Sequence, residues 1–159
     1  MIQDIFPNTE AILLDTNLFV VFVVGFVELS LWGRAPVDGY DRADFLLLAK
    51  TLGEFRRVVT TPFVVAEVNS LINTTYAREE CRTGLAAIVP SIAELYEPSK
   101  RLAFEPGIPR FGFTDISILR TARDTKAFVL SADGPLVQYL QGQKVAALHY
   151  TDWKKIAAM

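Results

Sequence analysis

Residues 11–17 read Ala-Ile-Leu-Leu-Asp-Thr-Asn, and the fold follows from this stretch. The four apolar residues that end at Asp15 are typical of a buried strand in a parallel sheet. Residues 17–32 follow as a segment that is apolar on most faces. Its longest apolar run, residues 18–27 apart from Gly25, is shorter than the roughly 20 residues that a membrane span needs. We therefore expect a strand followed by a buried helix, and no membrane partner.

Strands and helices are expected to alternate along the rest of the chain. Residues 33–39 predict a loop by their Gly and Pro content, and Thr61-Pro62 predicts a helix start. Thr114 is expected to cap another helix, and Pro90 to interrupt one. The predicted helices are 41–57, 62–73, 78–96, 114–124 and 134–142, and the predicted strands are 58–60, 127–131 and 145–148, with a possible strand at 101–104.

This alternation predicts an α/β fold around a mostly parallel central sheet flanked by helices. The 159 residues suit a single domain, 1–159, with a core from about residue 11 to 148. The mean hydropathy of +0.27 is high for a chain of this size and predicts an apolar surface that a partner covers. Because helix 17–32 is apolar nearly all round, we expect a homodimer.

Net charge and cysteine content limit which substrates and which cellular compartments fit the chain. The net charge of −2 provides no strong basic field, so an RNA substrate would need local cations or a metal ion to neutralise its phosphates. The lone cysteine, Cys81, makes an internal disulfide impossible, and the first residues lack the basic start of a signal peptide. These features predict a cytoplasmic protein.

Four acidic residues are predicted to meet where the strands end. Asp15 and Asp133 each follow a predicted strand, and ligands of α/β sheets bind beyond the carboxyl ends of the strands. Glu67 and Asp115 lie early in helices that start near the same edge. Both border the apolar face of their helix, and no basic residue stands three or four positions away. Because a carboxylate that faces a core needs a partner, the partner is distant in sequence or is a bound cation.

Each acid also has a purely structural interpretation. Asp15 can cap the helix that follows it, and Asp115 can favour its helix dipole. Asp133 with Gly134 can form a plain turn, and Glu67 can be a solvated edge residue. The convergence of four acids on one predicted edge favours a shared site over four separate structural roles.

The motifs around these acids resemble those of the PIN-domain family. Residues 13–17 (Leu-Leu-Asp-Thr-Asn) resemble its opening motif, and Thr61-Pro62 with Glu67 resembles its second. Residues 113–116 (Phe-Thr-Asp-Ile) resemble the third motif and residues 129–133 (Val-Leu-Ser-Ala-Asp) the fourth. The resemblance covers roughly residues 11–148 and is closest to the toxin ribonucleases of VapBC-type toxin–antitoxin pairs. The stretches 33–40 and 74–84 look longer than in compact toxins.

The resemblance implies a Rossmann-like sheet and a magnesium- or manganese-dependent endoribonuclease, a hydrolase that cuts the phosphodiester bonds of single-stranded or structured RNA. It implies a dimer and an antitoxin protein whose tail covers the acidic pocket. By this resemblance, metal binding and catalysis are expected from Asp15, Glu67, Asp115 and Asp133. The polar side chains that would support these acids are those of Asn17, Thr114 and Ser131.

The chemistry of the residues agrees with a hard cation, because clustered carboxylates without a nearby His or Cys select magnesium or manganese. Such a cation would lower the pKa of a water molecule and offset charge on the phosphate. Three arginines, Arg110, Arg120 and Arg123, either contact RNA phosphates or form a solvated basic helix face. His149 is expected at the surface or in packing.

Two other functions fit parts of the pattern. A HAD-like phosphatase would use Asp15 as its nucleophile, but that family needs a second Asp where Asn17 stands. A catalytically inactive PIN-like module that binds RNA or acts as a scaffold is the main alternative. The four intact acids argue against it.

Overall fold

The central strand of the sheet is β1, and the strands around it are all parallel. The computed structural model describes residues 2–27 and 31–159. β1 (Ala11–Leu14) lies between β2 (Arg57–Thr60) and β4 (Phe128–Ser131), and β3 (Ala93–Glu94) and β5 (Ala147–His149) form the edges. All four residues of β1 are buried, as expected for a parallel strand that is covered on both faces. The α/β fold with a Rossmann-like parallel sheet is confirmed.

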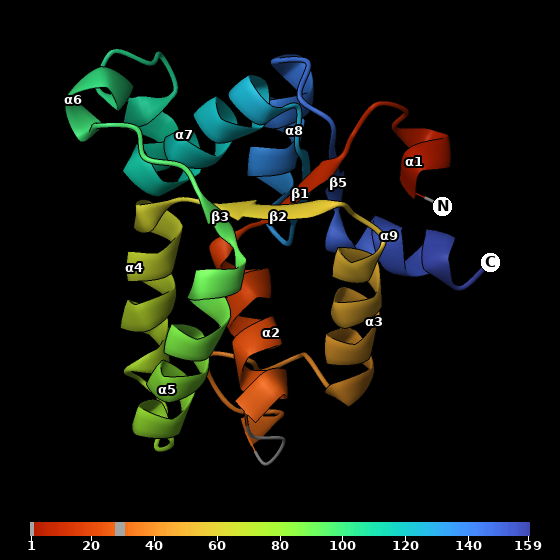
Figure 1. The fold of residues 1–159 in the computed structure, drawn as a ribbon, viewed down its shortest axis with the longest axis vertical. Coiled ribbons are helices and arrows are strands. Elements are labelled where there is room, and N and C mark those ends of the chain that lie inside the picture. The colour runs from red at the N-terminus through yellow and green to blue at the C-terminus, as the bar shows by residue number, and fades with distance from the viewer. Residues whose placement is uncertain (1, 28–30) are drawn as a thin grey trace.

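Helices cover both faces of the sheet (Figure 1). On one face lie α2 (Thr16–Val27), α3 (Arg42–Gly53), α4 (Pro62–Ile72) and α5 (Arg78–Ile88). On the other lie α6 (Ser99–Leu102), α7 (Ile108–Thr125) and α8 (Gly134–Gly142). The remaining helical elements are α1 (Ile2–Ile5), η2 (Val89–Ser91) and α9 (Tyr150–Ala157). No helix in the described part of the chain is long and apolar enough to cross a membrane.

The apolar helix α2 is covered by the chain's own helices. Most of its side chains are buried, and it packs against α3, α4 and α5. Phe26 of this helix is nevertheless 55% exposed, so the chain covers most of α2 but not all of it, and the homodimer stays a prediction. Residues 28–30, which were included in the predicted helix 17–32, lie outside the described residues.

Two helices end earlier than predicted. α3, whose first turn is capped by Asp41, ends at Gly53, and Arg57 already belongs to β2. The predicted helix 78–96 ends at Ile88, and Pro90 lies in the short 3-10 helix η2. The chain then adds the edge strand β3, whose two residues are too few to show an alternating pattern.

Three further predictions needed correction. The possible strand at 101–104 was wrong, because residues 99–102 form α6. Thr114 is not an N-cap, because α7 already begins at Ile108 and is interrupted at Gly112. Helix α9, which follows β5, was not predicted.

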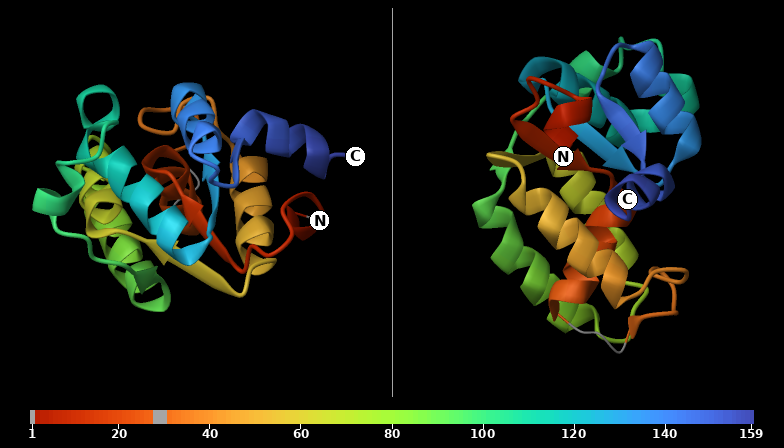
Figure 2. Two further views of the ribbon diagram at one scale, coloured as in Figure 1. Left: turned by 90° about the horizontal axis from the view of Figure 1, so that it is seen from above. Right: turned by 90° about the vertical axis from the view of Figure 1, so that its right-hand side faces the viewer.

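Buried polar contacts attach α9 to α3, and the two helices lie side by side in Figure 2. The indole N–H of Trp153 donates to Thr51 Oγ1 at 2.8 Å, and the Thr51 hydroxyl donates to the Leu47 carbonyl at 2.7 Å. Asp44 accepts hydrogen bonds from Lys154 at 2.7 Å and from the Tyr150 hydroxyl at 2.9 Å. The buried core therefore includes Trp153, beyond residue 148.

Replacing Thr51 by Val keeps the shape of the side chain but removes the acceptor of the Trp153 indole N–H. A buried donor without an acceptor costs about 1–3 kcal/mol. We therefore expect the free energy of unfolding, measured by urea denaturation, to fall by about this amount. Thr51→Ser keeps a hydroxyl and is the matched control, which should lose less. A Val variant as stable as the wild type would contradict this role of Thr51.

Candidate functional site

Asp15 lies at the carboxyl end of the central strand and is 4% exposed. Its Oδ1 accepts the backbone N–H of Leu18 at 2.9 Å, which caps the first turn of α2. Its Oδ2 accepts the Ser131 hydroxyl and the backbone N–H of Ala132, the latter at 2.8 Å. Burial raises the pKa of Asp15; these hydrogen bonds lower it less, and the charge of Asp133 raises it further. Asp15 is therefore both the cap of α2 and a member of the acidic site.

Ser131 connects Asp15 with Asp133. Besides donating to Asp15, the Ser131 oxygen accepts the backbone N–H of Asp133 at 3.0 Å. Asp133 caps α8, with its Oδ1 accepting the Leu136 N–H at 3.0 Å. Ser131, expected to give polar support, thus lies between the two aspartates that follow the neighbouring strands β1 and β4.

Asp115 and Glu67 come to the same region from α7 and α4. Burial, followed by the charges of Asp133, Glu67 and Asp15, raises the pKa of Asp115 from 3.8 to about 7. All the charges that shift this pKa are negative, and none comes from a Lys or Arg. The structure therefore brings the other three predicted acids within electrostatic reach of Asp115. Glu67 is the exposed member of the set.

A chain of buried hydroxyl groups joins α4 to α7. Thr61 Oγ1 accepts the Val64 N–H at 3.2 Å and lies 2.8 Å from Ser117 Oγ. Ser117 donates its own hydrogen to the Thr114 carbonyl at 2.6 Å, so the Thr61 hydroxyl must donate to Ser117. The two helices that carry Glu67 and Asp115 are thereby held together. The sequence indicated Thr61 as a helix cap, but Ser117 was missed because nothing local marks its partner.

The loop at residues 33–40 brings Tyr40 toward the acids. Burial, and then the charges of Asp15, Asp44 and Asp38, raise the pKa of the Tyr40 phenol. Its ring lies 6.2 Å from the ring of Tyr150, which begins α9. This loop therefore reaches the edge of the candidate site. The other long stretch, residues 74–84, consists of turns and the first half of α5.

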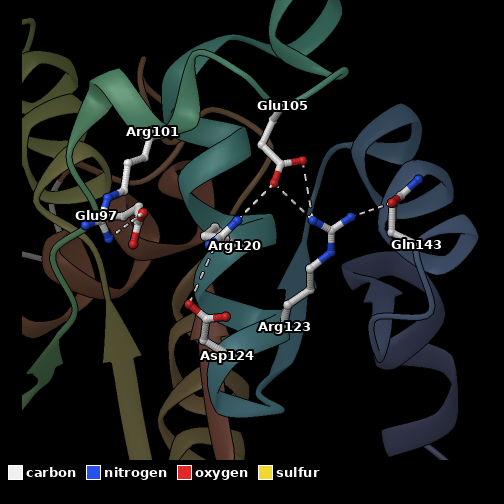
Figure 3. A network of polar contacts seen from close by, with 7 residues as sticks. All are labelled: Glu97, Arg101, Glu105, Arg120, Arg123, Asp124 and Gln143. Carbon is white, nitrogen blue, oxygen red and sulfur yellow. Dashed lines mark hydrogen bonds and ion pairs between the residues drawn. The ribbon is translucent and has the colours of Figure 1, made fainter.

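Two of the three predicted RNA-binding arginines are engaged in ion pairs (Figure 3). Arg120 and Arg123 both contact Glu105, at 3.3 and 3.2 Å, and Arg120 also pairs with Asp124 at 3.7 Å. These contacts attach the segment after α6 to α7 and favour a structural role for both arginines. Arg110 is exposed, and its guanidinium carbon lies 4.8 Å from the centroid of the Phe111 ring.

The remaining predicted residues have different surroundings. Asn17 is exposed in the first turn of α2. Thr114 contributes its carbonyl, which accepts the Ser117 hydroxyl, rather than a capping side chain. His149 caps α9 through its Nδ1, which accepts the Thr151 N–H, and its Nε2 lies 2.9 Å from the Ala132 carbonyl oxygen. The expected packing role of His149 is therefore confirmed, and it holds the segment between Ser131 and Asp133.

The donor set of the site fits a hard cation. Carboxylate oxygens are the ligands that magnesium and manganese prefer, and about one of the four acceptor positions of Asp15 is left free by its three hydrogen bonds. Among the described residues, no group of three or more His, Cys, Asp and Glu side chains stands ready to hold a metal ion. The fit to a cation therefore rests on the chemistry of the carboxylate oxygens and not on an assembled metal site.

Comparisons with known proteins support the fold alone. No family model matches the chain, and no curated protein matches it. Among solved structures, a domain of a functionally unknown protein from Methanocaldococcus jannaschii DSM 2661 is similar, with a TM-score of 0.50 and 15% sequence identity. The match covers 89% of this chain and 91% of that chain. The likeness extends over most of the architecture and carries no information on activity.

The uncompensated charge on Asp115 predicts a pH-dependent stability in the absence of metal. A pKa raised to about 7 means that the folded state binds this proton more tightly than the unfolded chain, whose pKa is near 3.8. The resulting stabilisation is fully present below the unfolded pKa and is lost as the pH rises through 7. In EDTA, Asp115→Asn should therefore have a higher Tm than the wild type at pH 8, with a smaller difference at pH 5.

The same variant should respond less to manganese. At about 100 times its Kd, a cation that binds only the folded wild type adds roughly 2.7 kcal/mol to the free energy of unfolding. Thermal melts with and without manganese would measure this gain, which we expect to shrink in Asp115→Asn. A lower Tm in EDTA combined with an undiminished manganese shift would show instead that Asp115 is only a structural residue at the start of a helix.

Proposed function

We propose that this protein is a metal-dependent ribonuclease that hydrolyses RNA phosphodiester bonds at the acidic edge of its sheet. The observation that carries the proposal is the convergence of Asp15, Glu67, Asp115 and Asp133, where burial and then the charges of the other three acids raise the pKa of Asp115 to about 7. A half-buried carboxyl group with so raised a pKa is typical of functional sites. The ordered motifs that resemble the PIN-domain family support the same activity.

Each acid has a distinct place in the proposed reaction. Asp15 and Asp115, the two acids whose pKa is raised, would hold magnesium or manganese, with Asp133 completing the donor set. When bound, the cation supplies positive charge that offsets the charge developing on the phosphate and acidifies water. Glu67, which is exposed on α4, would orient the attacking water and accept its proton. Ser131, which donates to Asp15 and accepts the backbone N–H of Asp133, fixes the positions of these two residues relative to each other.

We also propose a partner protein of the antitoxin type. An apolar pocket of about 290 Å³ opens between α2, α3, β2 and η2, with Phe22, Leu52 and Ile92 in its wall. Apolar side chains of a partner would fill such a pocket, in keeping with the high mean hydropathy of +0.27. Leu14, which precedes Asp15 in the chain, also lines the pocket, whereas none of the four acids does. The cytoplasmic location and the homodimer stay predictions.

Cleavage of RNA by the purified protein should require added manganese or magnesium and stop in EDTA. Asp15→Asn and Asp115→Asn each remove a proposed ligand, so we expect each to lose at least about 100-fold in cleavage rate. Asp124→Asn is the matched control: it lies on the same helix as Asp115 but pairs with Arg120 at 3.7 Å, and it should keep its activity. A panel of labelled RNAs resolved on denaturing gels measures these rates.

Equal cleavage by the wild type and by both site variants would sink the ribonuclease proposal, since the activity would then come from a contaminant or another site. Binding of RNA without any metal-dependent cleavage would instead favour the inactive PIN-like module.

A further inference from the structure

A pair of stacked phenylalanines lies on the two helices that carry Glu67 and Asp115. The rings of Phe63 and Phe113 are 6.4 Å apart at their centroids and inclined by only 14°. Phe63 stands four positions before Glu67, so the two share one face of α4. Phe113 stands two positions before Asp115 and is 40% exposed. Phe113 therefore offers part of its ring to solvent beside the acidic site, and the half-buried Phe63 packs against it.

The backbone at Gly112 sets the position of Phe113. With φ 79° and ψ −179°, Gly112 adopts a conformation that is essentially restricted to glycine, and it breaks α7 into two parts. A Cβ atom at this position would meet no other atom within 4 Å, so the conformation alone, and not crowding, demands glycine. The second part of α7 begins at Phe113, with Asp115 in its first turn. An unusual backbone conformation that leaves an apolar ring exposed beside an acidic site points to a binding role for that ring.

The platform formed by Phe63 and Phe113 is held in place by polar contacts beneath it. Thr61, two residues before Phe63, is joined through its hydroxyl to Ser117, four residues after Phe113. Both hydroxyl groups are buried, and their hydrogen bonds run from the first turn of α4 to the Thr114 carbonyl. The two rings thus have a fixed relation to the two acids, which a binding surface for substrate requires.

We propose that Phe113, held by its contact with Phe63, stacks against an unpaired base of the RNA and so positions the strand beside the acids. The proposal rests on the ribonuclease function proposed above. In a duplex the bases are stacked on one another and are not available to a protein ring, whereas an unpaired base can lie against an aromatic side chain. Because every base has a flat aromatic face, the platform would give little preference among the four bases.

Arg110, three positions before Phe113 in the chain, provides a positive charge on the same helix. It is exposed, lies just before the break at Gly112, and places its guanidinium over the ring of Phe111 at 4.8 Å. Unlike Arg120 and Arg123, it has no ion pair with an acid in the described part of the chain. It is therefore available to contact a phosphate of the strand whose base lies on Phe113.

The test measures binding separately from cleavage. The probe is a single-stranded RNA carrying 2-aminopurine, whose fluorescence is quenched when it stacks on a ring, titrated with the full chain in EDTA. We expect Phe113→Ala to weaken binding by about 5- to 100-fold, in line with the usual contribution of one base–aromatic stack, and to abolish the quenching. Phe113→Tyr keeps an aromatic face and should retain both. Phe104→Ala is the matched control, because Phe104 is 88% exposed outside the platform and should be silent.

Phe113→Leu separates stacking from packing. Leucine preserves an apolar contact with Phe63 but offers no aromatic face, so the platform predicts that it behaves like Phe113→Ala. Wild-type binding and quenching by the Leu variant, or no RNA binding by the wild type, would overturn the proposal. A double-stranded RNA of the same sequence should bind the wild type and Phe113→Ala equally, and a loss of duplex binding in the variant would also overturn it.

Failure of this proposal can be told apart from failure of the ribonuclease function. If the wild type cleaves RNA with added metal but Phe113→Ala binds and cleaves normally, the platform is refuted and the nuclease stands. If the wild type binds and quenches the probe but never cleaves, the platform stands and the nuclease is refuted.

Discussion

Burying the carboxylate of Asp15 at the end of the central strand is the constraint on which the arrangement of the site depends. The two oxygens of this carboxylate take hydrogen bonds from α2 and from the residues that end β4. A buried carboxylate without such donors would be costly, so β1, α2 and the end of β4 have to meet at this point. The order of the strands, with β1 between β2 and β4, then brings α4, α7 and the start of α8, which carry the other acids, to the same edge.

The same side chains stabilise the fold and form the candidate site. Asp15 and Asp133 each cap the helix that follows their own strand, and each carboxylate keeps acceptor capacity beyond its capping hydrogen bond. No cation or hydrogen-bond donor among the described residues lowers the pKa of Asp115. The structural and functional interpretations of these acids are thus compatible, because a capping carboxylate is held in a fixed orientation while part of it remains available to a ligand.

Local sequence signals predicted the parts of the structure that depend on local physics. The apolar runs that end at Asp15 and before Asp133 identified two central strands, and Thr61-Pro62 marked the start of α4. The start of α7 was missed because its first turn, which begins at Ile108, is separated from the rest of the helix by the non-helical residue Gly112. Contacts between distant residues, such as Thr61 with Ser117 or Arg123 with Glu105, leave no periodic pattern in the sequence. The aromatic platform was missed for the same reason.

The pairing of β1 with β4 also has a consequence for the order of events during synthesis. Asp15 and Ser131 are separated by 116 positions along the chain, so most of the protein has to leave the ribosome before the carboxylate finds its donors. Until then the first strand lacks one of its two neighbours, and closing so long a loop carries a large entropic cost. A nascent chain therefore lacks Asp133 and cannot assemble the acidic edge. If this edge cuts RNA, the topology itself keeps the activity switched off until translation of the domain is nearly complete.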